Sequence, residues 1–112
     1  MVINIRNKER VFIDSYFEAV RFTENNQTSL FSEEWEREQI IECLCFLVSC
    51  SCQLSDDNYS QAGHDFWLSR NGHGSLPTGF FDCADIYGKE NSQWLQSKAE
   101  KFGVTTGYFE EC

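Results

Sequence analysis

The stretch Asp65-Phe66-Trp67-Leu68-Ser69-Arg70-Asn71-Gly72 decides the fold that this sequence predicts. Residues 65–70 form a short aromatic run, and the Asn-Gly pair directly after them is a strong signal for a hairpin turn between two antiparallel strands. We expect the returning strand at residues 80–83 and a third strand at residues 104–110. Phe66 and Trp67 then point to opposite faces of the sheet, and we expect Trp67 to be buried in the core.

Three amphipathic helices are expected around this hairpin. The first covers residues 8–22, where apolar side chains recur on one helical face, namely Phe12, Ile13, Tyr16, Phe17 and Val20. The second covers residues 33–51 and begins after Ser32, a capping residue. Its expected buried stripe consists of Ile40, Leu44, Leu47 and Val48. The third covers residues 92–102 and ends at Gly103, which suits a left-handed cap.

These elements together predict an α+β fold in one domain spanning residues 1–112. Two N-terminal helices precede a small antiparallel β-β-α-β sheet unit, and helices cover one face of that sheet. A chain of 112 residues with 41% hydrophobic and 15% aromatic content has enough apolar surface for one core.

The charge of the chain is strongly negative and unevenly distributed. Eighteen acidic residues against nine basic ones give a net charge of −9, and residues 22–69 contain nine acidic residues but only one basic residue, Arg37. Such a field repels phosphate, so direct binding to nucleic acid is not expected. The sequence also has no apolar run of about 18 residues, which argues against a membrane-spanning segment or a membrane partner.

Four of the six cysteines lie close together as Cys43-x-Cys45 and Cys50-x-Cys52. The pattern could hold zinc if His64, His73 or Cys83 completed a tetrahedral site. Residues two apart on a helix point about 200° from each other, however, so each pair is poorly placed to chelate. We therefore expect structural, reduced thiols, no metal and no cofactor.

The segment GHDFWLSRNGHG, residues 63–74, resembles a string close to GHDFWLTRNGHGAGFWD in a family of small uncharacterised proteins encoded by tailed bacteriophages. Ser69 stands in place of the usual threonine, and residues 80–82, FFD, resemble the family's FWD. The resemblance extends weakly to residues 12–20 and 95–108. Residues 75–78 replace a shorter linker, and the acidic second helix has no counterpart. The resemblance implies a phage origin and a β-hairpin core. It supplies no activity. We expect the host cytoplasm because the N-terminal residues, among them Arg6, Lys8 and Arg10, lack the apolar run of a signal peptide.

The motif allows two interpretations. His64, Asp65 and His73 could combine a general base, a carboxylate and a second imidazole, which would make the protein a small enzyme or a ligand-binding protein. Histidines beside turns more often hydrogen-bond their own loop, and Asp65, Arg70 and Asn71 can do the same. We favour the structural interpretation, in which the protein has no catalytic residues and is not an enzyme.

The acidic residues suggest a function through a partner. Carboxylates along the second helix and just after it can imitate a line of phosphates in the groove of a nucleic-acid-handling protein, and the candidates are Glu33, Glu34, Glu38, Glu42, Asp56 and Asp57. We therefore expect an acidic accessory protein that binds and inhibits a host nucleic-acid-handling or defence protein. One alternative is an assembly factor that forms homo-oligomers through exposed aromatic residues such as Tyr59, Trp94 or Phe109.

Overall fold

The segment expected to form the first strand is a helix. In the computed structural model, which describes residues 7–71 and 79–109, Tyr59–Asn71 form α3 and Gly79–Cys83 form the 3-10 helix η3. The part of residues 104–110 that is described is extended, but it pairs only through one antiparallel bridge between Phe31 and Phe109. The described regions contain no β-sheet, so the predicted α+β fold with a β-β-α-β unit is wrong and the observed architecture is helical.

The physical reason is that α3 is buried on several sides. Its buried residues are Ala62, Gly63, Asp65, Phe66, Trp67, Ser69 and Arg70. A helix enclosed in this way lacks the polar face that produces a helical period, so its consecutive aromatic residues can be mistaken for a buried strand. The predicted hairpin at Asn71-Gly72 is replaced by the C-terminal end of α3 at Asn71, and Gly72 lies outside the described residues.

The other predicted helices are present. Helix α1 spans Asn7–Thr23 and α2 spans Glu33–Cys50, close to the expected bounds. Helix α5 spans Lys89–Glu100, so it begins three residues before the expected start, and the short α4, Ala84–Tyr87, precedes it. Gly103 has a φ of +80°, as expected for a left-handed residue after a helix.

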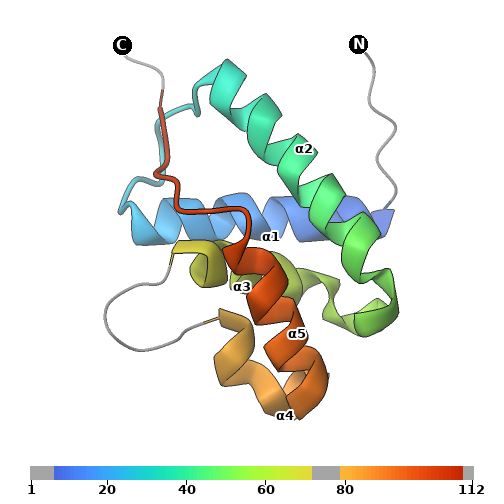
Figure 1. Cartoon of the computed structure of the whole chain (residues 1–112). Coiled ribbons are helices and arrows are strands. Elements are labelled where there is room, and N and C mark those ends of the chain that lie inside the picture. The colour runs from blue at the N-terminus through green and yellow to red at the C-terminus, as the bar shows by residue number, and fades with distance from the viewer. Residues whose placement is uncertain (1–6, 72–78, 110–112) are drawn as a thin grey trace.

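Helices α1 and α3 form the centre of the molecule, and α2 crosses α1 diagonally with its N-terminal end rising away from the other helices (Figure 1). Two 3-10 helices, η1 at Ser51–Gln53 and η2 at Asp56–Asn58, connect α2 to α3. The close approach of α1 and α3 requires a glycine at position 63. A Cβ atom there would lie 2.9 Å from the carbonyl carbon of Phe12 and would overlap the carbonyl oxygen.

The core is aromatic. The rings of Phe46 and Phe66 stack at 4.3 Å between centroids, and Phe12 lies about 6 Å from both. Trp67 is 1% exposed, which confirms its predicted burial although it lies on a helix. These contacts come from α1, α2 and α3, so the three helices share one core.

The buried face of α2 differs from the prediction. Its buried residues are Trp35, Gln39, Cys43, Phe46, Leu47 and Cys50. Of the predicted stripe, Leu47 is buried and Ile40 and Leu44 are partly buried, whereas Val48 is 82% exposed. The helix is therefore rotated toward the side that carries Trp35 and Phe46, because these two large rings bury more apolar surface than valine does.

Candidate functional site

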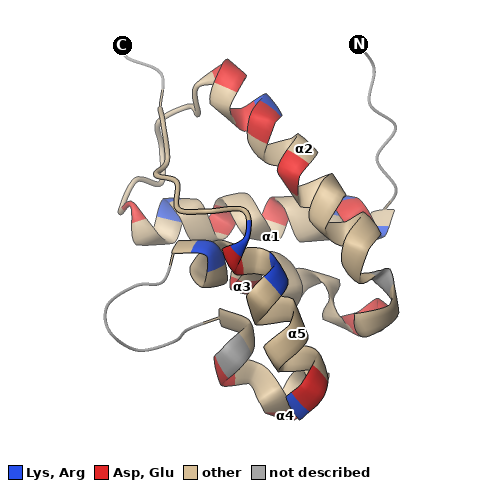
Figure 2. Ribbon diagram, in the orientation of Figure 1, with Lys and Arg blue, Asp and Glu red and all other residues tan. Residues whose placement is uncertain are grey.

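The N-terminal end of α2 carries a concentration of carboxylates. Backbone N–H groups at this end are partly satisfied by Ser32, whose hydroxyl accepts a 3.5 Å hydrogen bond from the Trp35 amide. Acidic side chains in the first turn are also stabilised by the helix dipole. We define the acidic end of α2 as Glu33, Glu34, Glu36 and Glu38. Figure 2 shows that acidic residues gather in this upper half of α2 while the lower half is mainly uncharged.

Aromatic contacts hold the acidic end in place. Trp35, between the glutamates in sequence, is buried and packs against Phe31 and Trp67. The C-terminal segment adds a second support, because the Ser32 amide donates a 2.8 Å hydrogen bond to the Tyr108 carbonyl and the Phe109 ring stacks on Phe31 at 5.0 Å. The carboxylates are thus presented by an anchored helix end.

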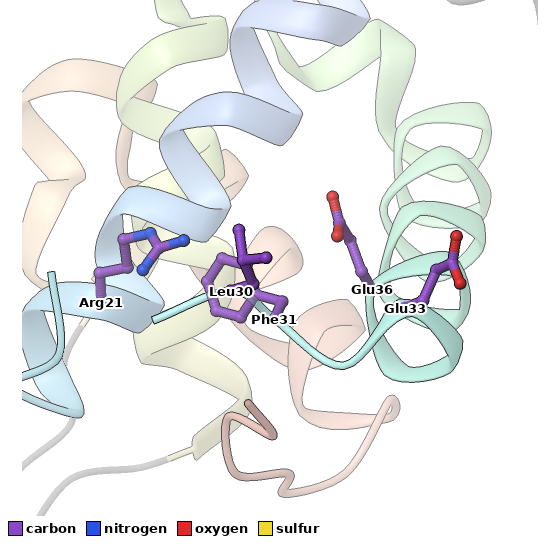
Figure 3. Close-up of a pocket in the computed structure, with 5 residues that line it drawn as sticks. All are labelled: Arg21, Leu30, Phe31, Glu33 and Glu36. Atoms are coloured by element: carbon purple, nitrogen blue, oxygen red, sulfur yellow. The ribbon is translucent and has the colours of Figure 1, made fainter. Parts of the chain in front are cut away.

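One hollow beside the acidic end has a volume of about 370 Å³. Its lining residues are Arg21, Leu30, Phe31, Glu33 and Glu36. Figure 3 shows Arg21 reaching from α1 toward Phe31, with both glutamates on the α2 side. The guanidinium carbon lies 4.3 Å from the Phe31 ring centroid, and the same group donates a 2.8 Å hydrogen bond to the Ser29 carbonyl. Arg21 is therefore occupied by its own loop.

A second hollow, of about 360 Å³, lies on the other side of the helix end. It is lined by Ser32, Glu34, Trp35, Glu38, Tyr108 and Phe109. Tyr108 is 57% exposed. Carboxylates beside aromatic rings suit a basic side chain, because charge-assisted hydrogen bonds and the ring face both attract a cation. Prediction from the sequence missed this hollow, since the contact between Trp35 and Tyr108 joins residues far apart in the chain.

The structure separates the six predicted partner-binding carboxylates into three groups. Glu33, Glu34 and Glu38 are exposed at the acidic end of α2. Glu42 is partly buried and accepts a 2.7 Å salt bridge from Arg70. Asp56 and Asp57 lie beyond the C-terminal end of α2, and an 18-residue helix is about 27 Å long. One continuous line of six carboxylates is therefore not formed.

Charge pairing distinguishes these groups further. In the parts of the chain that the structure describes, the salt bridges are Arg70–Glu42 and Lys8–Asp56, the latter at 2.5 Å. The hydrogen bond with Asp56 is the main cause that raises the pKa of Lys8. Neither pair includes a glutamate of the acidic end, whose carboxylates are left available to an external cation.

Asp65 is a buried carboxylate that is held by hydrogen bonds between helices. It is 1% exposed and accepts hydrogen bonds from the Tyr87 hydroxyl at 2.8 Å and from the Gln61 amide at 3.0 Å. Burial raises the pKa of its carboxyl above the ordinary 3.8, and the hydrogen bonds from Tyr87 and Gln61 oppose that shift. The contact ties α3 to α4.

Trp67 and Ser69 connect α3 to other elements. The Trp67 indole N–H donates a 2.7 Å hydrogen bond to the Thr23 hydroxyl at the end of α1. The Ser69 hydroxyl donates to Gln96 of α5 at 2.9 Å and accepts from the Phe80 amide at 3.0 Å. Trp67 and Ser69 thus fix how α3 packs against α1, α5 and η3.

Arg70 is the centre of a buried polar network. It is 4% exposed and donates hydrogen bonds to the carbonyls of Phe102 at 2.9 Å and Gly103 at 2.8 Å, in addition to its salt bridge with Glu42. Burial by itself lowers the pKa of the Arg70 guanidinium, but the combined interactions with Tyr16 and Glu42 outweigh it and raise this pKa above its ordinary value. The neighbouring Asn71 accepts a 2.9 Å hydrogen bond from the Thr105 amide. Arg70 and Asn71 therefore attach the C-terminal segment to α3.

Of the two histidines of the motif, the structure describes only His64. His64 is partly buried beside Asp65 on α3, and adjacent helical residues point about 100° apart. The Asp65 carboxylate is enclosed by Tyr87 and Gln61, which fits the structural interpretation of the motif. His73 lies outside the described residues.

The cysteines of α2 follow helical spacing. Cys43 and Cys50 share the buried face, whereas Cys45 is exposed. Burial raises the pKa of Cys50 to about 12, so this thiol stays protonated at neutral pH. Across residues 7–71 and 79–109, no three potential metal ligands of the His, Cys, Asp or Glu type form a group.

The aromatic residues proposed for homo-oligomerisation are less available than expected. Tyr59, Trp94 and Phe109 are partly buried and pack against the core. Lys98 also lies over the Trp94 ring, 5.3 Å from its centroid. None of the helices in the described regions has the length and apolar character needed to cross a membrane.

Comparison with known proteins gives no relative from which a role could be inferred. No protein-family model matches the chain, and neither a curated protein nor a solved structure matches it. A role for this protein must therefore be inferred from its own residues and their geometry.

Proposed function

We propose that this protein is a small acidic accessory protein, of the kind that bacteriophages encode, which binds a nucleic-acid-handling or defence protein in the host cytoplasm and inhibits it. The binding element is the acidic end of α2, which competes with nucleic acid for a basic surface of the partner. The observation that carries the proposal is that Glu33, Glu34, Glu36 and Glu38 are gathered on one anchored helix end with no salt-bridge partner among the described residues.

The surroundings of the acidic end support this proposal. Two hollows flank it, each with glutamates beside aromatic side chains. The second hollow, where Glu34 and Glu38 lie beside Trp35 and Tyr108, suits a lysine or arginine side chain of a phosphate-binding surface, whereas Arg21 already covers the Phe31 ring in the first. The net charge of −9 adds a long-range attraction toward a basic partner. The resemblance of residues 63–74 to a phage family supports the origin, while the motif itself supplies the scaffold.

The test is retention of a partner from bacterial host lysate on immobilised protein, with identification by mass spectrometry. The variant Glu34→Lys with Glu38→Lys reverses two charges of the acidic end. A matched control, Asp14→Lys with Glu18→Lys, reverses two exposed charges at the same i, i+4 spacing on α1. Circular dichroism checks that both variants are folded.

The proposal predicts that a specific protein is retained by the wild type and the α1 control but lost with the α2 variant, and that rising salt releases it. Equal retention by both variants would mean that the acidic end is not the binding element. Equal loss with both would show a response to net charge alone, and this too would contradict the proposal.

A further inference from the structure

The outward side of α2 carries a row of exposed residues that includes part of the acidic end. We define the outer seam as Glu34, Glu38, Ile41, Cys45 and Val48. These positions are separated by four, three, four and three residues, which is the heptad spacing by which helices pack against each other. Val48 is 82% exposed, Ile41 is 44% exposed, and the other three positions are also exposed.

The seam lies opposite the face that α2 buries. At 100° per residue, the five seam positions fall within about 80° of arc, and Gln39, Cys43 and Cys50 lie on the far side of the helix. The core already accounts for those buried residues. Within the described residues, α2 therefore packs on the core through that far side of the helix and not through the seam.

The two ends of the seam differ chemically. Its N-terminal positions are glutamates, whereas its C-terminal positions are isoleucine, cysteine and valine, so the seam is acidic at one end and apolar at the other. Fourteen helical steps separate Glu34 from Val48, which is about 21 Å along the helix axis. A partner that matches this surface needs cations at one end and apolar side chains at the other, repeated at helical spacing.

We propose that the outer seam docks an amphipathic helix of the partner protein, with lysine or arginine facing Glu34 and Glu38 and aliphatic residues facing Ile41, Cys45 and Val48. This proposal rests on the function proposed above and specifies the chemistry of the partner. It differs from binding by charge alone because the apolar half of the seam contributes contact area and sets the register.

Charge complementarity selects this occupant over a second copy of the chain. Parallel pairing of two seams would bring Glu34 and Glu38 of one copy against the same glutamates of the other. Antiparallel pairing would bury these carboxylates against valine and cysteine without a cation. A net charge of −9 on each copy adds further repulsion.

Docking on the outer seam is tested with a fluorescent helical peptide of 21 residues. The peptide carries lysines at one end and leucines at the other, all at heptad positions. We call these striped peptides, and two versions, with the lysines at either end, cover both orientations. A scrambled peptide of the same composition lacks the heptad spacing of the lysines and leucines. Binding is measured by fluorescence anisotropy. The rate of Cys45 alkylation, followed by mass spectrometry, reports whether the seam is covered.

Two pairs of variants separate the contributions. Ile41→Ser with Val48→Ser removes the apolar half of the seam. Val11→Ser with Val104→Ser is its matched control, because these valines are 45% and 75% exposed on other parts of the molecule. Glu34→Lys with Glu38→Lys tests the acidic half, and thermal melts confirm folding of all variants.

The proposal predicts that one striped peptide binds at least tenfold more tightly than the scrambled one and slows Cys45 alkylation. The seam serine variant should lose at least tenfold in affinity, and the control less than twofold. The proposal is overturned if the striped peptides bind no more tightly than the scrambled one, or if the seam serine variant binds the striped peptide as tightly as the wild type does. If the Glu34 and Glu38 variant alone weakens peptide binding, the seam is overturned and the proposed function survives. Dimerisation of the free protein through Cys45 and Val48 would instead assign the seam to a second copy.

Discussion

Replacing Gly63 by alanine should destabilise the protein, although the residue lies inside a helix. At an exposed helical position, alanine is favoured over glycine by about 1 kcal/mol. At position 63 a Cβ atom would lie 2.9 Å from the carbonyl carbon of Phe12 and 3.1 Å from the Cβ of Ser15, with overlap of the Phe12 carbonyl oxygen. Carbon atoms in contact are normally 3.5–4.0 Å apart, so α1 and α3 must separate by roughly half an ångström or more.

The expected loss follows from these opposing effects. Overpacking typically costs about 1–3 kcal/mol, and this site is at the upper end because two of the opposing atoms belong to a helix backbone that cannot rotate away. After subtraction of the propensity gain, the free energy of unfolding should fall by about 2 kcal/mol. At roughly 4 °C per kcal/mol, the melting temperature should fall by about 8 °C.

The assay is thermal and urea unfolding followed by circular dichroism. Exposed Ser97 in α5 supplies the control, because Ser97→Ala should be about 1 kcal/mol more stable than Ser97→Gly. Glycine and alanine should thus have opposite orders of stability at positions 63 and 97. A Gly63→Ala variant as stable as the wild type, or more stable, would refute the packing of α3 against α1.

Three further predictions concern other buried residues of the motif, namely Arg70, Trp67 and Asp65. Arg70→Met leaves Glu42 and the carbonyls of Phe102 and Gly103 without their donor, and should cost about 3–5 kcal/mol in urea unfolding; a loss below about 1 kcal/mol would contradict the network. Trp67→Ala should cost about 3–5 kcal/mol, enough to unfold most of a domain of this size, and an unchanged melting temperature would remove Trp67 from the core. Because burial raises the pKa of Asp65 above 3.8, the folded state holds this proton more tightly than the unfolded chain does. The free energy of unfolding of the wild type relative to Asp65→Asn should therefore decrease as the pH rises from below 4 to 7, and a difference that increases with pH would show that the sign is wrong.

The helices that could be predicted are those whose signals are local. In α1 the apolar residues recur on one face, and α2 begins with a serine cap and acidic residues, so both were expected close to their observed bounds. The rotation of α2 was predicted less well. Its deciding contacts are those of Trp35 with Phe31 and Trp67, and the spacing of α2 alone does not show them.

Helix α3 could not be recognised because its deciding contacts are tertiary. The burial of Asp65 and Arg70 depends on Tyr87 and on the carbonyls of Phe102 and Gly103. The sequence does not show those partners, whereas an aromatic run followed by Asn71-Gly72 is a local signal for a strand and a hairpin turn.

The candidate site was predicted only in part for the same reason. Exposed carboxylates at the start of α2 follow from helical spacing. The pairing of Glu42 with Arg70 joins residues 28 positions apart, and the pairing of Asp56 with Lys8 joins residues 48 positions apart. Only the fold shows that these two carboxylates are already engaged, while the acidic end of α2 is available.

If the acidic end of α2 occupies a nucleic-acid site on its partner, this protein and nucleic acid must compete for that partner. The most direct measurement titrates this protein into a preformed complex of the retained partner with fluorescent duplex DNA, and follows release of the DNA by anisotropy. We expect complete release by the wild type and by Asp14→Lys with Glu18→Lys, and at least tenfold weaker release by Glu34→Lys with Glu38→Lys. A partner that holds DNA and this protein at the same time, with unchanged affinity for both, would contradict this expectation.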